Sequence, residues 1–159
     1  MNDREYSEVI LRRNMEILGL LCMYTTASLE DYKTRTIDVR KVVFFGIVGL
    51  VISFFKGQYS FLSMLGGVLI GIFFYILSIV SKEKIGKGDA IIIAATGVYL
   101  GFVNTIILVW ISSVLALIAG LIVVRRHKLN NEPELPFIPF MLVGYVLMLT
   151  IGTIRGVLI

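Results

Sequence analysis

The chain has 159 residues, of which 57% are hydrophobic, and its mean hydropathy is +0.90. A soluble domain is only about 45–50% apolar even with glycine counted, and here the excess is gathered in long runs. The composition excludes a soluble globular protein and predicts one all-α, polytopic membrane domain. The net charge of +4 is typical of the Lys and Arg excess in cytoplasmic loops, so we expect no nucleic-acid partner.

Composition also constrains redox and metal chemistry. Cys22 is the only cysteine, which excludes an intrachain disulfide, a CxxC zinc site and an iron–sulfur site. His127 is the only histidine and lies in a basic loop, where we interpret it as solvated, so a histidine-rich metal site is excluded as well. We therefore expect neither a metal ion nor a cofactor.

The apolar runs predict six membrane spans. Residues 1–8 mix acids and bases and show no cleavage site, so we expect no cleaved signal peptide, and residues 6–13 are expected to lie along the interface. One helix over residues 90–124 would measure about 52 Å, against a hydrocarbon core of about 30 Å. We therefore expect a tight turn near residues 101–105. The expected spans are residues 15–29, 42–55, 61–80, 90–103, 106–124 and 137–159.

The basic residues predict the orientation of these spans in the cytoplasmic membrane. The loops after the first, third and fifth spans hold ten of the fifteen basic residues. Because cytoplasmic loops carry the excess of Lys and Arg, we expect these three loops inside the cell and both termini outside. If residues 90–124 crossed only once, two of the basic loops would fall on opposite faces, which favours the hairpin.

This topology places two aspartates at the same depth on the cytoplasmic side. Asp31 ends the first span, and Asp89 begins the fourth after a turn that contains Gly86 and Gly88. An acidic group that enters the membrane is expensive, and two carboxyl groups that face each other share a proton. One can then act as base on a water while the other polarises a carbonyl, which is aspartic-protease chemistry.

A purely structural interpretation stays open on these grounds, because polar residues flank every span and Gly and Asp are ordinary turn residues. The alternative is a non-catalytic small membrane protein, either a transporter or an assembly factor, with both aspartates paired to lysines. An inverted repeat would favour a transporter, and the sequence shows no convincing internal repeat. The equally interfacial acids are Glu30, Asp38, Glu83, Glu132 and Glu134.

Three segments resemble the prepilin peptidases, the membrane aspartic proteases that process type IV prepilins and preflagellins. Residues 31–37 (Asp-Tyr-Lys-Thr-Arg-Thr-Ile) are similar to the family's Asp, five mostly polar or basic residues and Ile-Pro-Asn. Residues 86–89 (Gly-Lys-Gly-Asp) are similar to its GxGD motif, and residues 136–140 (Pro-Phe-Ile-Pro-Phe) to its Pro-Phe-Gly-Pro-Phe. The departures from the family's pattern, none of which removes an aspartate, are Asp38, Val39, Ile91 and Ile138.

The resemblance implies a membrane aspartic endopeptidase whose catalytic pair is Asp31 and Asp89. The substrates it implies are prepilin-like or preflagellin-like precursors, which carry a short basic leader before a hydrophobic helix and are cut at the cytoplasmic face. Loop acids are usually just solvated, but Glu30, Glu132 and Glu134 are candidates to bind the basic leader. A divergent GxGD protease of the presenilin class, similar only at that motif, is the other enzyme alternative.

The resemblance also assigns roles to turn residues. It implies that Gly86 and Gly88 bring Asp89 close to the scissile bond and that Pro136 and Pro139 stiffen the start of the last span. All four are equally explained as ordinary turn and helix-start residues. Larger prepilin peptidases carry an N-methyltransferase region with paired CxxC motifs, so this chain, with one cysteine, is expected to be a peptidase only.

Overall fold

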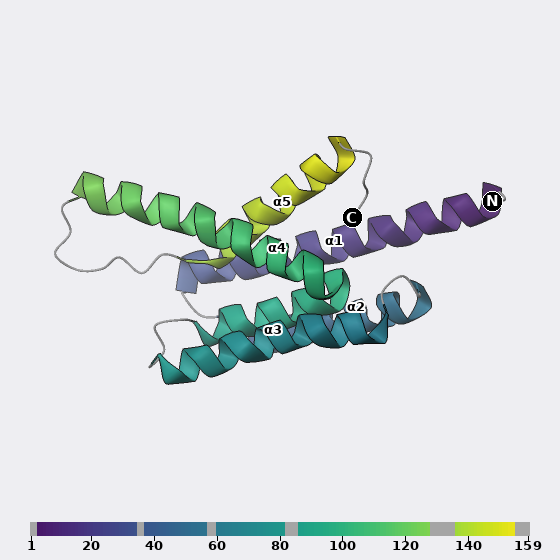
Figure 1. The fold of residues 1–159 in the computed structure, drawn as a ribbon, viewed down its shortest axis with the longest axis horizontal. Helices are drawn as coiled ribbons and strands as arrows, with labels where there is room; N and C mark the ends of the chain where they lie inside the picture. The colour runs from purple at the N-terminus through teal and green to yellow at the C-terminus, as the bar shows by residue number, and fades with distance from the viewer. Residues whose placement is uncertain (1–2, 35–36, 57–59, 82–85, 128–135, 155–159) are drawn as a thin grey trace.

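The computed structural model describes residues 3–34, 37–56, 60–81, 86–127 and 136–154. These residues are all-helical and contain no strand. Helix α4 is central because it contacts each of the other four helices, and its contact with α3 is the most extensive (Figure 1). The helices are α1 (Asp3–Thr34), α2 (Val39–Lys56), α3 (Phe61–Val80), α4 (Lys87–His127) and α5 (Ile138–Ile154).

The outer surface of the bundle is apolar. Large hydrophobic side chains point away from the protein on every helix, and Leu18 and Trp110 are 60% and 70% exposed. Phe61–Val80 and Lys87–Arg125 are long and apolar enough to cross a membrane, and Ile138–Gly152 is a shorter apolar helix. A soluble monomer rarely exposes so much contiguous apolar surface. The protein is therefore an all-helical membrane protein, and the six-span count and the orientation stay predictions.

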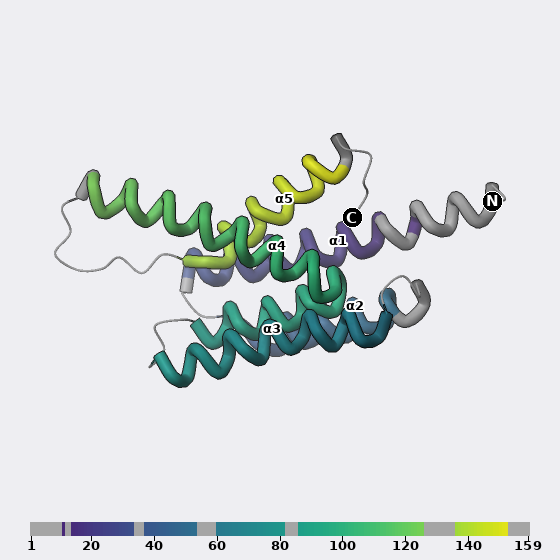
Figure 2. The backbone as a smooth tube through the Cα atoms, viewed as in Figure 1, coloured from purple at the N-terminus to yellow at the C-terminus, as the bar shows by residue number. Residues whose placement is uncertain are grey.

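A sharp kink divides α4 at Gly101, within the residues where the turn was expected. Gly101 has φ 68° and ψ −174°, a conformation that favours glycine, and the chain reverses its direction there (Figure 2). Two hydroxyl groups satisfy the backbone at the kink. The Phe102 N–H donates to Ser63 Oγ at 3.2 Å, and Thr105 Oγ1 donates to the Gly101 carbonyl at 2.6 Å. The two halves of α4 therefore meet at one residue rather than through a loop.

Two helix starts differ from those expected. Helix α1 runs without a break from Asp3, so residues 6–13 continue the helix of the first expected span instead of forming a separate interfacial segment. The sequence supplies neither glycine nor proline before Gly19 to stop it. Helix α2 begins at Val39, because the Asp38 carboxylate accepts the Arg40 N–H at 3.1 Å and so caps the helix.

Small residues allow α3 and the first half of α4 to pack backbone against backbone. A Cβ atom on Gly67 would lie 2.5 Å from the Gly97 carbonyl oxygen and 2.6 Å from its Cα, and one on Gly71 would collide with Ala94. Lipid is as apolar as leucine, so helices in a membrane associate through such close contacts and through hydrogen bonds rather than through the hydrophobic effect. This contact fixes the half of α4 that begins at Asp89.

We expect Gly101→Ala to destabilise the protein by about 1–3 kcal/mol, because an L side chain at this positive φ is strained. Thermal unfolding in detergent measures the loss. Gly46→Ala is the matched control, since its Cβ would meet only the Ala95 Cβ at an ordinary 3.8 Å. Equal stability of the two variants would contradict the assignment of the kink to Gly101.

Candidate two-aspartate site

The structure places Asp31, near the end of α1, within electrostatic reach of Asp89, near the start of α4, although the two residues are far apart in sequence. Asp31 lies in the last turn of α1 and is 9% exposed, and Asp89 lies half-buried in the first turn of α4. Burial acts most strongly on the Asp89 carboxyl group, and the charge of Asp31 acts on it as well. Two like charges that interact in this way oppose each other's ionisation. A pair of this kind can present a base and an acid to one substrate.

The Gly86–Asp89 turn packs on the connection that follows Asp31. A Cβ on Gly88 would collide with the Ile37 side chain and would lie 3.1 Å from the Ile37 Cβ, and one on Gly86 would lie 3.0 Å from Asp89 Oδ2. Because the Ile37 Cβ is fixed to the backbone, the connection itself would have to move. Gly88 is therefore the position that lets Ile37 approach the start of α4 beside Asp89.

Glu30 is engaged within the chain. Its carboxylate forms an ion pair with Lys41 and accepts the Asp38 N–H at 3.2 Å. The Lys41 hydrogen bond is the main reason why the pKa of Glu30 falls below its ordinary value, and it likewise raises the pKa of Lys41. The pair ties the end of α1 to the start of α2, so a basic leader would compete with Lys41 for Glu30. Glu132 and Glu134 lie outside the described residues.

The predicted prolines stand at the start of α5. Pro136 precedes the helix and Pro139 is its second residue, where the backbone N–H has no helical partner to lose. The Phe137 carbonyl accepts the N–H groups of Phe140 at 3.0 Å and Met141 at 3.2 Å, which closes the first turn. The helix-start interpretation accounts for both prolines.

Among the buried polar residues that sequence reasoning missed are Glu16, Tyr24 and Thr96. Glu16 is 7% exposed on α1 and its charge acts on Tyr99, whereas Tyr24 and Thr96 are fully buried. The signal for Glu16 was available, because it is an acidic residue inside the first expected span and such residues are functional-site hypotheses by default. Tyrosine and threonine carry no comparable signal.

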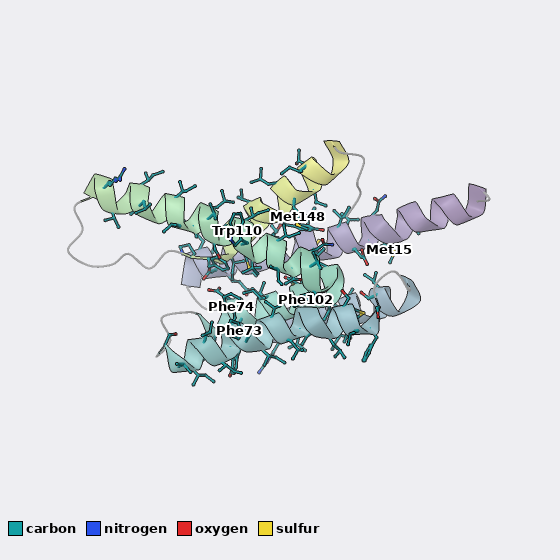
Figure 3. All side chains as sticks on the ribbon, in the orientation of Figure 1. Met15, Phe73, Phe74, Phe102, Trp110 and Met148 are labelled. Carbon is teal, nitrogen blue, oxygen red and sulfur yellow. The ribbon has the colours of Figure 1, made fainter. Side chains whose placement is uncertain are left out.

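An apolar groove of about 390 Å³ lies between α3 and α4 and contains neither aspartate. Phe73, Phe74 and Phe102 line it (Figure 3). The described residues also contain no group of three or more His, Cys, Asp or Glu side chains that could hold a metal ion.

The fold and the site define a class of protein. It is a helical membrane protein in which α1 and α4 each contribute one carboxyl group to the site. The model of the type IV leader peptidase family matches residues 18–121, more than half of the chain, and both aspartates lie within the match. The chain belongs to the type IV leader peptidase family, and it is a protease of that family. The resemblance drawn from the sequence is confirmed, although residues 136–140 lie beyond the matched region. Neither curated proteins nor solved structures gave a significant match.

We expect Gly88→Ala to destabilise the protein by about 1–3 kcal/mol, because the added Cβ overpacks the contact with Ile37. Adding Ile37→Ala should restore part of that loss, since residues in direct contact are not additive. Thermal unfolding of the two single variants and the double variant measures the coupling. Strictly additive losses would show that Gly88 and Ile37 do not meet.

Proposed function

We propose that this protein is an aspartic endopeptidase that removes the short basic leader from type IV prepilin-like or preflagellin-like precursors. Asp31 and Asp89 are its catalytic pair. The cleavage takes place at the cytoplasmic face of the cytoplasmic membrane, in a six-span topology with both termini outside. Membership of the family supports a leader peptidase activity, and the electrostatic interaction between the two carboxyl groups is the observation that carries the catalytic assignment.

The pair needs only water as its co-reactant. One carboxylate takes a proton from a water molecule, whose oxygen adds to the scissile carbonyl carbon. The other carboxyl group, protonated, donates a hydrogen bond to the carbonyl oxygen and stabilises the charge that develops there. The tetrahedral intermediate then collapses with cleavage of the C–N bond, and the proton taken from the water passes to the leaving nitrogen. Both groups lie at helix ends, and because Asp31 is buried and Asp89 is half-buried, the site has to open to admit water and an extended stretch of substrate.

The position of the pair at the interface also suits the substrate. A precursor with a hydrophobic helix after its leader lies with that helix in lipid and its leader outside the hydrocarbon core. The residues at the junction must unwind before a carboxyl pair can attack a backbone carbonyl. The non-catalytic alternative, a transporter or an assembly factor, requires each aspartate to be neutralised by a lysine rather than by the other carboxyl group.

Asp31→Asn and Asp89→Asn should each lower the rate of precursor cleavage by at least about 10²–10⁴-fold, because each variant removes one member of the acid–base pair. Cleavage of a candidate prepilin in membranes, followed by gel mobility, measures the rate. Asp38→Asn is the matched control, because it makes the same chemical change at an exposed carboxylate whose role is to cap α2. Full activity of either aspartate variant would overturn the dyad.

The leader-binding role of Glu132 and Glu134 is part of the same proposal. Glu132→Lys together with Glu134→Lys should raise the KM for a basic leader and leave kcat nearly unchanged, because the added repulsion acts on binding alone. The effect should shrink as ionic strength rises, since salt screens exposed charges. A substrate with a neutral leader serves as the control. An unchanged KM at low salt would exclude these two acids from leader binding.

A further inference from the structure

A buried hydrogen bond joins α1 to α4 in the middle of the bundle. The hydroxyl groups of Tyr24 and Thr96 lie 2.6 Å apart, and neither residue is exposed. Thr96 also donates to the Ile92 carbonyl at 2.8 Å, and because a threonine hydroxyl has one proton, Tyr24 must be the donor to Thr96. The Tyr145 ring on α5 packs against Tyr24 with centroids 5.7 Å apart, which holds the tyrosine in place.

The position of this bond relative to the aspartates follows from helix geometry. Tyr24 precedes Asp31 by seven residues, and Thr96 follows Asp89 by seven residues. Seven residues make about two turns, so on each helix the polar residue and the aspartate share one face about 10.5 Å apart. In Figure 1, α1 and the first half of α4 run in opposite directions. A bond between Tyr24 and Thr96 therefore places Asp31 level with Asp89.

The direct contact between α1 and α4 is small. Helix α1 contacts α4 much less extensively than it contacts α2 or α5. Helix α4 is held independently by its close packing with α3 and by two hydrogen bonds to α2, from Tyr99 to the Phe45 carbonyl at 2.6 Å and from Ser53 to the Val98 carbonyl at 3.1 Å. Besides the Tyr24–Thr96 bond, the Tyr99 ring of α4 lies against Gly19 of α1. Loss of the bond therefore leaves α1 freer to slide or rotate while α4 keeps its place.

We propose that Tyr24 and Thr96 are positioning residues that set the register of α1 against α4 and so hold the two carboxyl groups in reach of each other. The role of this register in catalysis rests on the proposed function. The register itself is a structural property and is independent of that function. Apolar faces slide past one another with little specificity, but a buried hydroxyl pair has one satisfied arrangement. The bond therefore supplies the specificity that the apolar surroundings lack.

The register is tested by cross-linking, without reference to activity. In full-length protein with Cys22→Ser, Asp31→Cys and Asp89→Cys, a short bis-maleimide should join the two thiols in membranes. Lys33 and Lys87 flank these positions, so tryptic peptides identify the product by mass spectrometry. Tyr24→Phe or Thr96→Val should lower the yield about threefold, the factor that matches the average hydrogen bond between membrane helices. Thr96→Ser, which keeps the hydroxyl, should restore it.

The kinetic arm uses the natural aspartates. Tyr24→Phe and Thr96→Val should lower kcat about 10–100-fold with little change in KM, because the catalytic groups are displaced while the leader-binding surface is intact. Thr96→Ser should recover most of kcat. The double variant should be no worse than either single variant, since both remove the same bond.

Ser53→Ala is the matched control, because it removes a buried hydrogen bond between α4 and α2 instead of one between α4 and α1. It should leave the cross-linking yield and kcat near those of the unmodified chain. The proposal is overturned if Tyr24→Phe and Thr96→Val both retain the full cross-linking yield, or if Ser53→Ala lowers it as much as they do. If the cross-linking responds as expected and the unmodified chain cleaves no precursor, the register holds and the proposed function fails.

Discussion

The partial burial of Asp89 beside the charge of Asp31 is the constraint that the arrangement of α1 and α4 has to meet. Bringing two acids together at the edge of a low-dielectric bundle costs free energy unless they share a proton, so the helices that carry them must be held together by other contacts. The packing of Ile37 against Gly88 and the Tyr24–Thr96 hydrogen bond are two such contacts. The Glu30–Lys41 ion pair adds a link from the end of α1 to the start of α2.

The same logic explains why the interior of the bundle is rich in small residues and hydroxyl groups. The outer surface faces lipid, so burying more apolar area gains little, and specific contact must come from close packing and polar bonds. Gly67 and Gly97 supply the close packing, and Ser63 and Thr105 satisfy the backbone at the Gly101 kink. The half of α4 that carries Asp89 is held by such contacts up to the kink, which makes it the fixed frame of the site.

The sequence was sufficient for features that follow from length and charge. The apolar run of residues 90–124 is too long for one span, and the kink appears at Gly101, where a break was expected. Residues 61–80 form a helix with the expected bounds. Both aspartates were found because acidic residues at the edge of an apolar run are unusual and because the surrounding motifs resemble those of a known family. Each of these inferences uses position along the chain and none requires the rotation of a helix.

The sequence could not show how each helix is rotated about its own axis. In a soluble protein the buried face is apolar and the exposed face is polar, so periodicity reveals which side chains meet. Here both faces are apolar, and nothing in the pattern distinguishes the buried Tyr24 from the exposed Tyr75. The contact between Ile37 and Gly88 joins residues that are distant in sequence, and the Glu30–Lys41 pair could equally have been two solvated charges. The rotation of α1 follows instead from a few polar and steric contacts, and these lie within two helical turns of the carboxyl pair.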